Sequence, residues 1–238
     1  MAKKTKQHAE ALRRFDRNTL YSPVDALEIV KTLAYAKFDE SVDSVFTLGV
    51  DPRKADQLVR GTVSLPHGTG KSVRILVFAE SDAARDAEAA GADIVGGKEL
   101  AEQISGGRSL DFDIAVAAPD MMSHVGKLGP ILGPRGLMPN PKSGTVTKDV
   151  GKAVTEFKAG RVEYRNDRYG NVHLPVGRVS FESESLSENF GSVASELARA
   201  RPASAKGRFL RKIAVSSTMG PGVRIDPGAV EEMVKELQ

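Results

Sequence analysis

The sequence predicts an α/β protein: an α+β domain made from both chain ends, interrupted by an inserted domain that carries a small parallel sheet. Two observations predict this class. Both ends combine helical patterns with alternating strands, whereas the middle repeats strand and helix as βαβ units do. The first domain is expected at residues 1–66 and 161–238, and the inserted domain at 67–160. One continuous α/β domain is the alternative.

The first 66 residues are expected to form two helices followed by two strands. Ser22 and Pro23 indicate the start of the second helix, because a hydroxyl cap followed by proline is typical of that position. The first strand alternates apolar and polar residues, which is the period of a half-buried strand. In chain order the elements are expected at residues 3–18, 22–37, 41–50 and 59–66.

The middle of the chain is expected to alternate strands with helices. Residues 72–79 form a near-continuous apolar run, as in a strand buried on both faces of a parallel sheet. Strands are expected at residues 72–79, 93–95 and 112–117. Helices are expected at residues 81–90, 98–104, 121–128 and 148–157. A long loop rich in glycine and proline is expected at 129–144, and such loops are usually functional.

The last third returns to the pattern of the first. Residues 161–164 and 171–174 flank a turn at 165–170, which predicts a hairpin. The remaining elements are a helix at 186–200, strands at 213–217 and 223–225, and a helix at 230–237.

The composition excludes several kinds of site. The 238 residues include no cysteine and four scattered histidines, so we expect no disulfide, no metal site and no cofactor. No apolar run approaches the roughly 20 residues that span a bilayer, and the N-terminus lacks a secretory signal. A cytoplasmic protein without a membrane partner is therefore expected.

The net charge of +3 hides an uneven distribution. Each chain end carries a net charge of +2 and the insert carries −1. Basic residues gather in two clusters, which can bind phosphate backbones but can also be solvated faces. The clusters consist of Lys3, Lys4, Lys6, Arg13, Arg14 and Arg17, and of Arg199, Arg201, Lys206, Arg208, Arg211 and Lys212.

No motif predicts catalysis. The segment Gly68–Ser72 (GTGKS) lacks the first glycine of a P-loop and precedes a strand instead of a helix, so a glycine hinge between domains is the better interpretation. A nucleotide-binding or enzymatic protein using this loop is the alternative. Asp111, Asp113 and Asp120 could do acid–base chemistry, but no nucleophile accompanies them. His124 and His173 have no sequence neighbour that suggests a triad.

Two short segments suggest RNA contact. Lys37 and Phe38 pair a cation with an aromatic ring that could stack on an unpaired base, although a core role for Phe38 is the simpler interpretation. Residues 216–224 (SSTMGPGVR) combine hydroxyl groups, an exposed Gly220 N–H and Met219 at a loop tip, where a methionine would be wet. In the Gly/Pro-rich region, Lys127, Arg135 and Lys142 could face an anion or RNA.

Several long motifs, in the same order, are similar to those of a known family. They are AKFDESVD (36–43), RGTVSLPHGTGK (60–71), AGADIVGG (90–97), LGPILGPRGLMPNPKSGTV (128–146), AGRVEYRND (159–167) and SSTMGPGVRID (216–226). The chain resembles the universal family of large-subunit ribosomal proteins found on the mobile stalk beside the tRNA exit site. The likeness runs through the whole sequence.

The resemblance implies a binding protein and not an enzyme. It implies that the discontinuous domain binds the stalk of large-subunit ribosomal RNA, that the inserted domain faces exit-site tRNA and assists its release, and that a hinge joins them. It also implies repression of the protein's own mRNA, a monomer when free, and a cytoplasmic location in the ribosome. The implied RNA contacts are Lys37, Phe38, Asp167, Arg168, Thr218, Met219 and Gly220, and the hydroxyl of Ser216 in the 216–224 segment is expected to join them. The hinge residues are Pro66, Gly68, Gly70 and Gly160.

Overall fold

The computed structural model describes residues 6–107 and 111–236, so Lys3, Lys4 and the predicted helix end at residue 237 lie outside the described residues. Its contacts divide the chain into two compact units, each a mixture of helices and strands. Unit 1 comprises residues 1–70 and 162–238, and unit 2 comprises residues 71–161. The predicted α/β class is confirmed. The predicted domain boundaries, 66/67 and 160/161, lie within a few residues of these limits.

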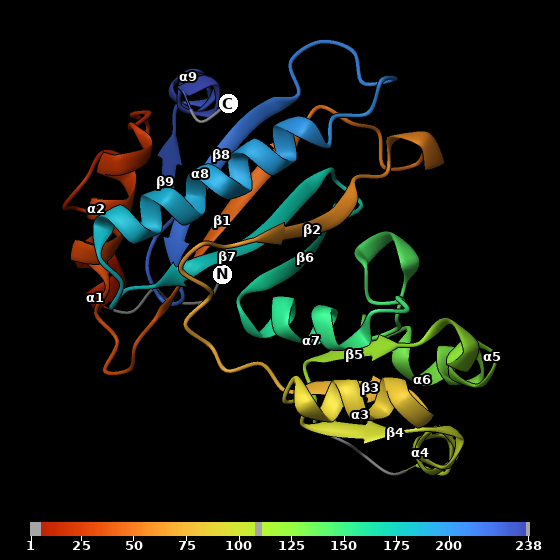
Figure 1. Ribbon diagram of the computed structural model, residues 1–238. Coiled ribbons are helices and arrows are strands. Elements are labelled where there is room, and N and C mark those ends of the chain that lie inside the picture. The colour runs from red at the N-terminus through yellow and green to blue at the C-terminus, as the bar shows by residue number, and fades with distance from the viewer. Residues whose placement is uncertain (1–5, 108–110, 237–238) are drawn as a thin grey trace. The chain divides into compact units, whose positions relative to one another are not determined.

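Unit 1 is built on a four-stranded antiparallel sheet in the order β7-β1-β8-β9 (Figure 1). The strands are β1 (Ser41–Leu48), β7 (Asn171–Arg178), β8 (Leu210–Ser217) and β9 (Val223–Ile225). Because β1 comes from the N-terminal part and its neighbours from the C-terminal part, the sheet joins the two ends of the chain. A separate two-stranded sheet consists of β2 (Arg60–Ser64) and β6 (Arg161–Arg165).

Helices cover one face of the four-stranded sheet. They are α2 (Pro23–Leu33), α8 (Ser183–Arg199) and α9 (Pro227–Glu236), and Figure 1 shows α8 crossing the strands. Alternate residues of β1 are buried, and Phe46 stacks on Phe190 of α8 with 5.6 Å between ring centroids. Helix α2 begins as predicted, since the Ser22 hydroxyl accepts the N–H of Asp25.

The opposite face of the sheet is polar and partly exposed, and we call it the open face. The strand register aligns its side chains in rows, because residues directly opposite each other project from the same face. Val45 lies between His173 and Ala214, and Thr47 lies between Asn171 and Lys212. The open face consists of Asp43, Val45, Thr47, Asn171, His173, Pro175, Lys212, Ala214, Ser216 and Arg224.

Unit 2 has a parallel sheet in the order β4-β3-β5, as the apolar run predicts. Its strands are β3 (Ile75–Phe78), β4 (Ile94–Gly96) and β5 (Ile114–Ala117), and all four residues of β3 are buried. The longer helices are α3 (Ser81–Ala89), α4 (Lys98–Ser105) and α7 (Val150–Lys158). Helix α3 packs on α7, while α4 packs on the helical segment that follows β5. Gly91, with φ of 87°, follows the end of α3.

Three predicted elements differ from the structure. Within the described residues the first helix, α1, spans Lys6–Ala11 and not 3–18, and the Asp16 carboxylate then accepts the N–H of Asn18 in a turn. The second helix ends at Leu33 and not near residue 37. Strand β6 pairs with β2, so the predicted hairpin is reduced to a turn with one bridge between Asn166 and Val172.

The predicted loop at 129–144 is partly helical. A run of short helical turns continues from the predicted helix at 121–128 into this region. They are η2 (Pro119–Met121), α5 (Met122–Val125), η3 (Gly126–Leu128) and α6 (Gly129–Leu132), followed later by η4 (Pro141–Ser143). Leu128 and Leu132 are fully buried, so core packing of two leucines holds a glycine- and proline-rich sequence in helical turns. In unit 1, η1 (Ala55–Gln57) is a similar short turn.

A buried asparagine ties α8 to the sheet and to the end of the β2 segment. The Asn189 amide nitrogen donates to the carbonyl oxygens of Val176, at 2.7 Å, and Gly68, at 3.1 Å. Its oxygen accepts the backbone N–H of His67 at 3.0 Å. The side chain is fully buried, its bond to Val176 is buried, and its bonds to Gly68 and His67 are partly buried.

We predict that Asn189→Ala lowers the free energy of unfolding by about 2–3 kcal/mol, because it leaves buried backbone groups unpaired. Urea unfolding at neutral pH measures this change. Ser192→Ala, which removes a hydroxyl that bonds only within α8 on its exposed side, is the matched control and should change stability by less than about 0.5 kcal/mol. Equal stability of the two variants would contradict the prediction.

Candidate RNA-binding site

A buried carboxylate joins two loops at one end of unit 1. Glu40, 1% exposed, lies between the α2–β1 loop and the loop that joins β8 to β9. Its Oε1 accepts the backbone N–H groups of Tyr35, at 3.1 Å, and Ala36, at 2.8 Å. Its Oε2 accepts the N–H of Met219 at 2.9 Å. One side chain therefore fixes both loops. Because Glu40 accepts the N–H groups of Tyr35 and Ala36, these groups are not available for hydrogen bonds that would extend α2 beyond Leu33.

Glu40 is held in its charged form. Burial acts to raise the pKa of its carboxyl group, but hydrogen bonds from the Ser217 hydroxyl and from the N–H groups of Met219, Ala36 and Tyr35 outweigh burial and lower it. Among the described residues Glu40 forms no ion pair, so these hydrogen bonds stabilise its carboxylate. The negative charge of Glu40 therefore serves to hold the two loops together.

Further hydrogen bonds fix the 218–220 loop. Thr218 and Ser41 exchange backbone and side-chain bonds: the Thr218 N–H donates to the Ser41 carbonyl, and the Ser41 N–H donates to Thr218 Oγ1, both at 3.0 Å. The Tyr35 hydroxyl donates to the Met219 carbonyl at 2.8 Å. A Cβ at Gly220 would lie 2.4 Å from Ser217 Oγ, so this position requires glycine.

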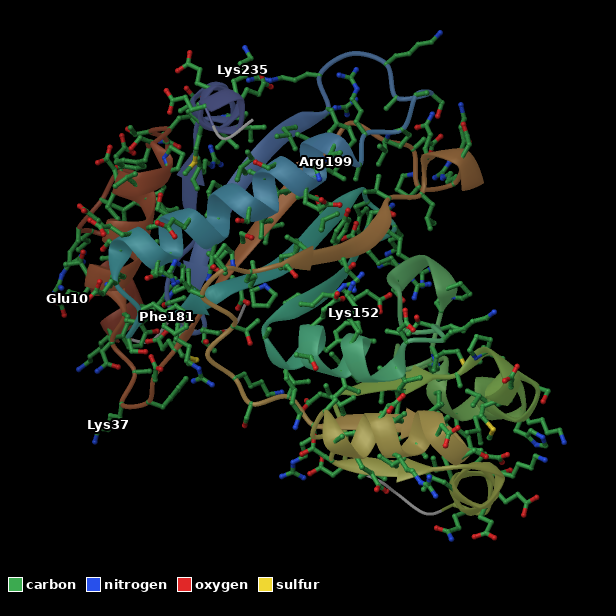
Figure 2. All side chains as sticks on the ribbon, in the orientation of Figure 1. Glu10, Lys37, Lys152, Phe181, Arg199 and Lys235 are labelled. Carbon is green, nitrogen blue, oxygen red and sulfur yellow. The ribbon has the colours of Figure 1, made fainter. Side chains whose placement is uncertain are left out.

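The fixed loops present side chains of mixed chemistry to solvent. Phe38 is 57% exposed and Met219 is 48% exposed. Lys37 is exposed and extends away from the ribbon (Figure 2). The core role considered for Phe38 is therefore wrong: β1 begins three residues later, and the core positions of this segment are taken by Leu33 and Val42.

The Gly220 N–H, in contrast, is not exposed for a ligand. It donates to the Ser217 hydroxyl at 3.1 Å and to the Ser217 carbonyl at 3.3 Å. Ser217 itself is buried, whereas Ser216 lies on the open face. The expected exposure of the Gly220 N–H is therefore wrong, because the tight turn uses this N–H internally.

The other predicted contacts lie at the far end of β1. Thr47, near the end of this strand, pairs with Asn171, which follows the β6–β7 turn containing Asp167 and Arg168. Strand β1 has eight residues, so the two groups are separated by roughly 23 Å along the strand. The open face connects them.

Asp167 organises the β6–β7 turn. Its Oδ1 accepts the N–H groups of Tyr169 and Asn171, both at 2.8 Å, and its Oδ2 accepts the Asn171 amide at 3.1 Å. Burial acts to raise the pKa of Asp167, but the bonds from Asn171, Tyr169 and His173 outweigh it and lower the pKa. His173 Nε2 lies 3.6 Å from Oδ2, so this histidine has the carboxylate neighbour that the sequence did not reveal.

The turn also exposes an aromatic ring that the sequence reasoning missed. Tyr169 is 68% exposed, and the guanidinium carbon of Arg168 lies 4.9 Å from its ring centroid. The signal was present in the sequence as an aromatic residue inside a predicted turn, where a buried role is uncommon.

The second basic cluster lies near this turn. Arg199, labelled in Figure 2, stands at the C-terminal end of α8. Arg208 forms an ion pair with Glu231 at 3.4 Å, and Arg199 lies 3.7 Å from Glu196. Lys206, Arg211 and Lys212 are exposed. In the described part of the first cluster, Arg14 pairs with Glu10 at 2.8 Å.

Each residue proposed as a hinge lies within one of the two units: Pro66, Gly68 and Gly70 in unit 1, and Gly160 in unit 2. In unit 1, Arg178 Nε donates to the Gly70 carbonyl at 2.9 Å, and Asn189 holds Gly68. The glycines at 68, 70 and 160 all have positive φ. Pro66 is exposed and follows β2. The chain leaves unit 1 between Gly70 and Lys71, and it returns after Arg161.

The GTGKS segment does not resemble a phosphate cradle. Lys71 Nζ lies 2.7 Å from Asp113 Oδ1, and strand β3 follows it. The ion pair with Lys71 lowers the pKa of Asp113. Asp111 pairs with Arg74 at 2.6 Å, and Asp120 is exposed, so the three aspartates do not form one acid–base group.

The cations of the Gly/Pro-rich region lie on the surface of unit 2. Lys127 and Arg135 are exposed, whereas the side chain of Lys142 lies outside the described part of the structure. Among residues 6–107 and 111–236, no group of three or more His, Asp or Glu side chains could hold a metal ion. In the same residues, no helix has the length and apolar character needed to cross a membrane.

Comparison with known proteins identifies the class. The model of the ribosomal protein L1p/L10e family matches residues 30–221, a range that includes both loops, the β6–β7 turn and all of unit 2. The chain belongs to this family. It is accordingly a ribosomal protein and not an enzyme.

Full-length relatives agree with the family match, and each is named large ribosomal subunit protein uL1. The relative from Cutibacterium acnes is 57% identical over 97% of this chain and 99% of its own length. The relative from Rubrobacter xylanophilus is 57% identical over 95% and 99%. The relative from Nocardioides sp. is 54% identical over 98% and 97%.

We predict that Glu40→Gln lowers the free energy of unfolding at pH 7 by about 2 kcal/mol, because bonds to a charged acceptor are lost. The folded pKa of Glu40 lies below its ordinary value of 4.5, so its contribution is complete above that pH and is lost as pH falls through the folded pKa. Urea unfolding from pH 7 to pH 3 should show the difference between wild type and variant shrinking. Glu28→Gln, at an exposed position of α2, is the control. A difference that does not change with pH would contradict the prediction.

Proposed function

We propose that unit 1 binds the stalk region of large-subunit ribosomal RNA through its open face and the loops at both ends of that face. The chain is a structural constituent of the large ribosomal subunit and acts in the ribosome, in the cytoplasm. The family match and the names of the full-length relatives support this. The observation that carries the RNA site is the pair of loops fixed by Glu40, which hold an exposed Phe38 and Met219 beside Lys37.

The exposed groups match what RNA offers. Phe38 can stack on an unpaired base, and Met219 can cover a base or a ribose. Lys37, Lys212 and Arg224 supply cations for phosphates, and such contacts give affinity that falls with salt. Thr218, Ser217 and Glu40 contribute mainly by fixing the shape of the loops. Ser216 lies on the open face, where its hydroxyl can bond to the RNA. Pre-organised loops avoid part of the entropy cost of binding.

The open face gives the RNA a continuous path. The Lys37–Met219 end and the Asp167–Arg168 end lie about 23 Å apart along β1. An A-form stem or a folded internal loop can span such a length with several backbone contacts. We infer that Arg168 contacts a phosphate, and that Asp167 acts by holding the turn, because both its oxygens accept hydrogen bonds within it.

Unit 2 is proposed to face exit-site tRNA and to assist its movement and release. Exposed Lys127 and Arg135, together with Lys142 in sequence, offer cations to an RNA backbone. Motion between the units is proposed to pivot at Gly160 and just after Gly70, where the chain leaves unit 1, with Pro66 and Gly68 on the unit 1 side. The hydrogen bonds that hold Gly68 and Gly70 in unit 1 support that placement.

The protein is also proposed to repress translation of its own mRNA, by binding there a structure that mimics the stalk. It is expected to be a monomer when free of RNA. The same loops would serve both RNAs, so the mRNA and the stalk RNA should compete. The rival function, nucleotide binding at Gly68–Ser72, has no support from Lys71, which pairs with Asp113.

We predict that Met219→Ala weakens binding of a stalk RNA fragment about tenfold at fixed salt, because about 1.4 kcal/mol of apolar contact is lost. The backbone groups of Met219 hold the loop, so truncating the side chain should leave stability unchanged. Filter binding or fluorescence anisotropy measures the dissociation constant.

The matched control for Met219→Ala is Val24→Ala, a truncation at an apolar side chain of α2 that is 47% exposed. Its dissociation constant should equal that of the wild type. An unchanged dissociation constant for Met219→Ala would remove this loop from the site.

Titrations of the wild type with scrambled RNA and with ATP, at two salt concentrations, separate stalk recognition from general RNA binding and from nucleotide binding.

We predict that unit 1 alone retains the RNA affinity of the full chain within about threefold, because the proposed contacts all lie within it. Residues 1–70 joined to 162–238 by a short Gly/Ser linker keep the hydrogen bonds from Asn189 and Arg178. Circular dichroism confirms folding before the RNA titration. If unit 2 alone bound the stalk RNA with the affinity of the full chain, the proposal that unit 1 carries the RNA contacts would be overturned.

A further inference from the structure

Tyr169 is an exposed aromatic residue on a rigid turn. An aromatic side chain buries 150–250 Å² when it enters a core, so leaving one in solvent forgoes a large stabilisation. Tyr169 is 68% exposed, a larger fraction than Phe38 at 57% or Met219 at 48%. Its ring therefore contributes little to the fold, and its position calls for a role on the surface.

The backbone beneath the ring is fixed on both sides. Asp167 Oδ1 accepts the Tyr169 N–H at 2.8 Å. The carbonyl of Gly170 accepts the N–H of Leu48 at 2.8 Å, which ties the turn to the end of β1. Gly170 has φ of 80°, and a Cβ there would meet the carbonyl oxygens of Leu48 and Val50. The turn thus places the Tyr169 side chain at a defined point at the edge of the open face.

A cation lies on the ring. The guanidinium carbon of Arg168 is 4.9 Å from the Tyr169 ring centroid, within the range of a cation–π contact. Arg168 is exposed, and no ion pair to a carboxylate is found for it among the described residues. The arrangement offers an aromatic surface and a positive charge side by side.

More cations lie at this end of unit 1. Lys212 lies on the same row of the open face as Thr47 and Asn171, so it is two strands from the turn, at about 10 Å. Arg165, four residues before Tyr169, and Arg211, next to Lys212, are both exposed. A protein partner would need a broader apolar patch, whereas a single ring among cations fits a base and its phosphates.

We propose that Tyr169 is a stacking platform for one unpaired base of the bound RNA, with Arg168 placed against the adjacent phosphate. This inference rests on the proposed function, since it names a second point of base recognition at the far end of the open face. Phe38 and Tyr169 then hold the RNA at the two ends of β1. Stacking reads the presence of an unpaired base and not its identity, so this contact selects for RNA shape.

The test uses the full chain and the stalk RNA fragment, with Tyr169→Ala, Tyr169→Phe and Tyr169→Leu. Stacking on an aromatic side chain contributes about 1–3 kcal/mol per base, so Tyr169→Ala should weaken binding about 5- to 150-fold. Phe should preserve the affinity, and Leu should not. The slope of affinity against salt should be unchanged for all three, whereas Arg168→Ala should reduce it by about one. Leu58→Ala, at an apolar side chain 40% exposed, is the control.

A second measurement identifies the base. Each unpaired nucleotide of the fragment is replaced in turn by an abasic one, and binding to wild type and to Tyr169→Ala is compared. One abasic site should weaken binding to the wild type and have no effect with the variant, which is the coupling expected of a direct stack. Additive losses at every position would overturn the proposal.

The outcomes separate this inference from the proposed function. If the wild type binds scrambled RNA of equal length as well as the stalk fragment, the proposed function fails. If the wild type prefers the stalk fragment and Tyr169→Ala binds it with an unchanged dissociation constant, only the stacking platform is overturned. Unchanged urea unfolding of Tyr169→Ala excludes a loss of structure as the cause of weaker binding.

Discussion

The geometry of the loop site in unit 1 depends on one buried carboxylate. Glu40 is stabilised by the Ser217 hydroxyl and three backbone N–H groups from two loops. The end of α2, the start of β1 and the β8–β9 loop are therefore one hydrogen-bonded assembly. Because charged acceptors form the stronger bonds, this assembly can expose Phe38 and Met219 without losing its shape.

A second carboxylate has the corresponding role at the opposite end of β1. Asp167 accepts backbone N–H groups of its own turn, and the turn is bonded to the end of the strand. Both ends of the open face thus combine an acidic residue used for structure with basic and aromatic residues left for a ligand. Glu40 is buried and Asp167 accepts hydrogen bonds within its own turn, so the acid at each end is engaged in the fold while Lys37 and Arg168 stay exposed.

Unit 2 uses its charges differently. Lys71, Arg74, Asp111 and Asp113 pair with one another at the start of the parallel sheet, where the sequence alone suggested either a phosphate loop or a carboxylate group. These ion pairs engage the side chains that the sequence alone offered for phosphate binding or acid–base catalysis. The Gly/Pro-rich segment, expected as a loop, packs Leu128 and Leu132 into the core and leaves Lys127 and Arg135 outside. Its surface is therefore better suited to contact than to catalysis.

The sequence by itself determined the α/β class and nearly all of the strands and longer helices, because periodicity and turn chemistry are local properties. It offered Lys37, Phe38 and Met219 as candidate contacts through residue chemistry and family resemblance, while leaving a core role for Phe38 as the simpler interpretation. It misplaced the pairing of β6, the end of α2 and the Gly220 N–H, and it missed Tyr169. The pairing of β6 with β2 and the β1–β7 contact that fixes the turn of Tyr169 depend on partners distant in sequence. Glu40 and Ser217 lie only a few residues from the N–H groups that they accept at the end of α2 and at Gly220, but their burial depends on the fold. Only the tertiary structure decided them, since burial and strand register are set by segments that the chain brings together on folding.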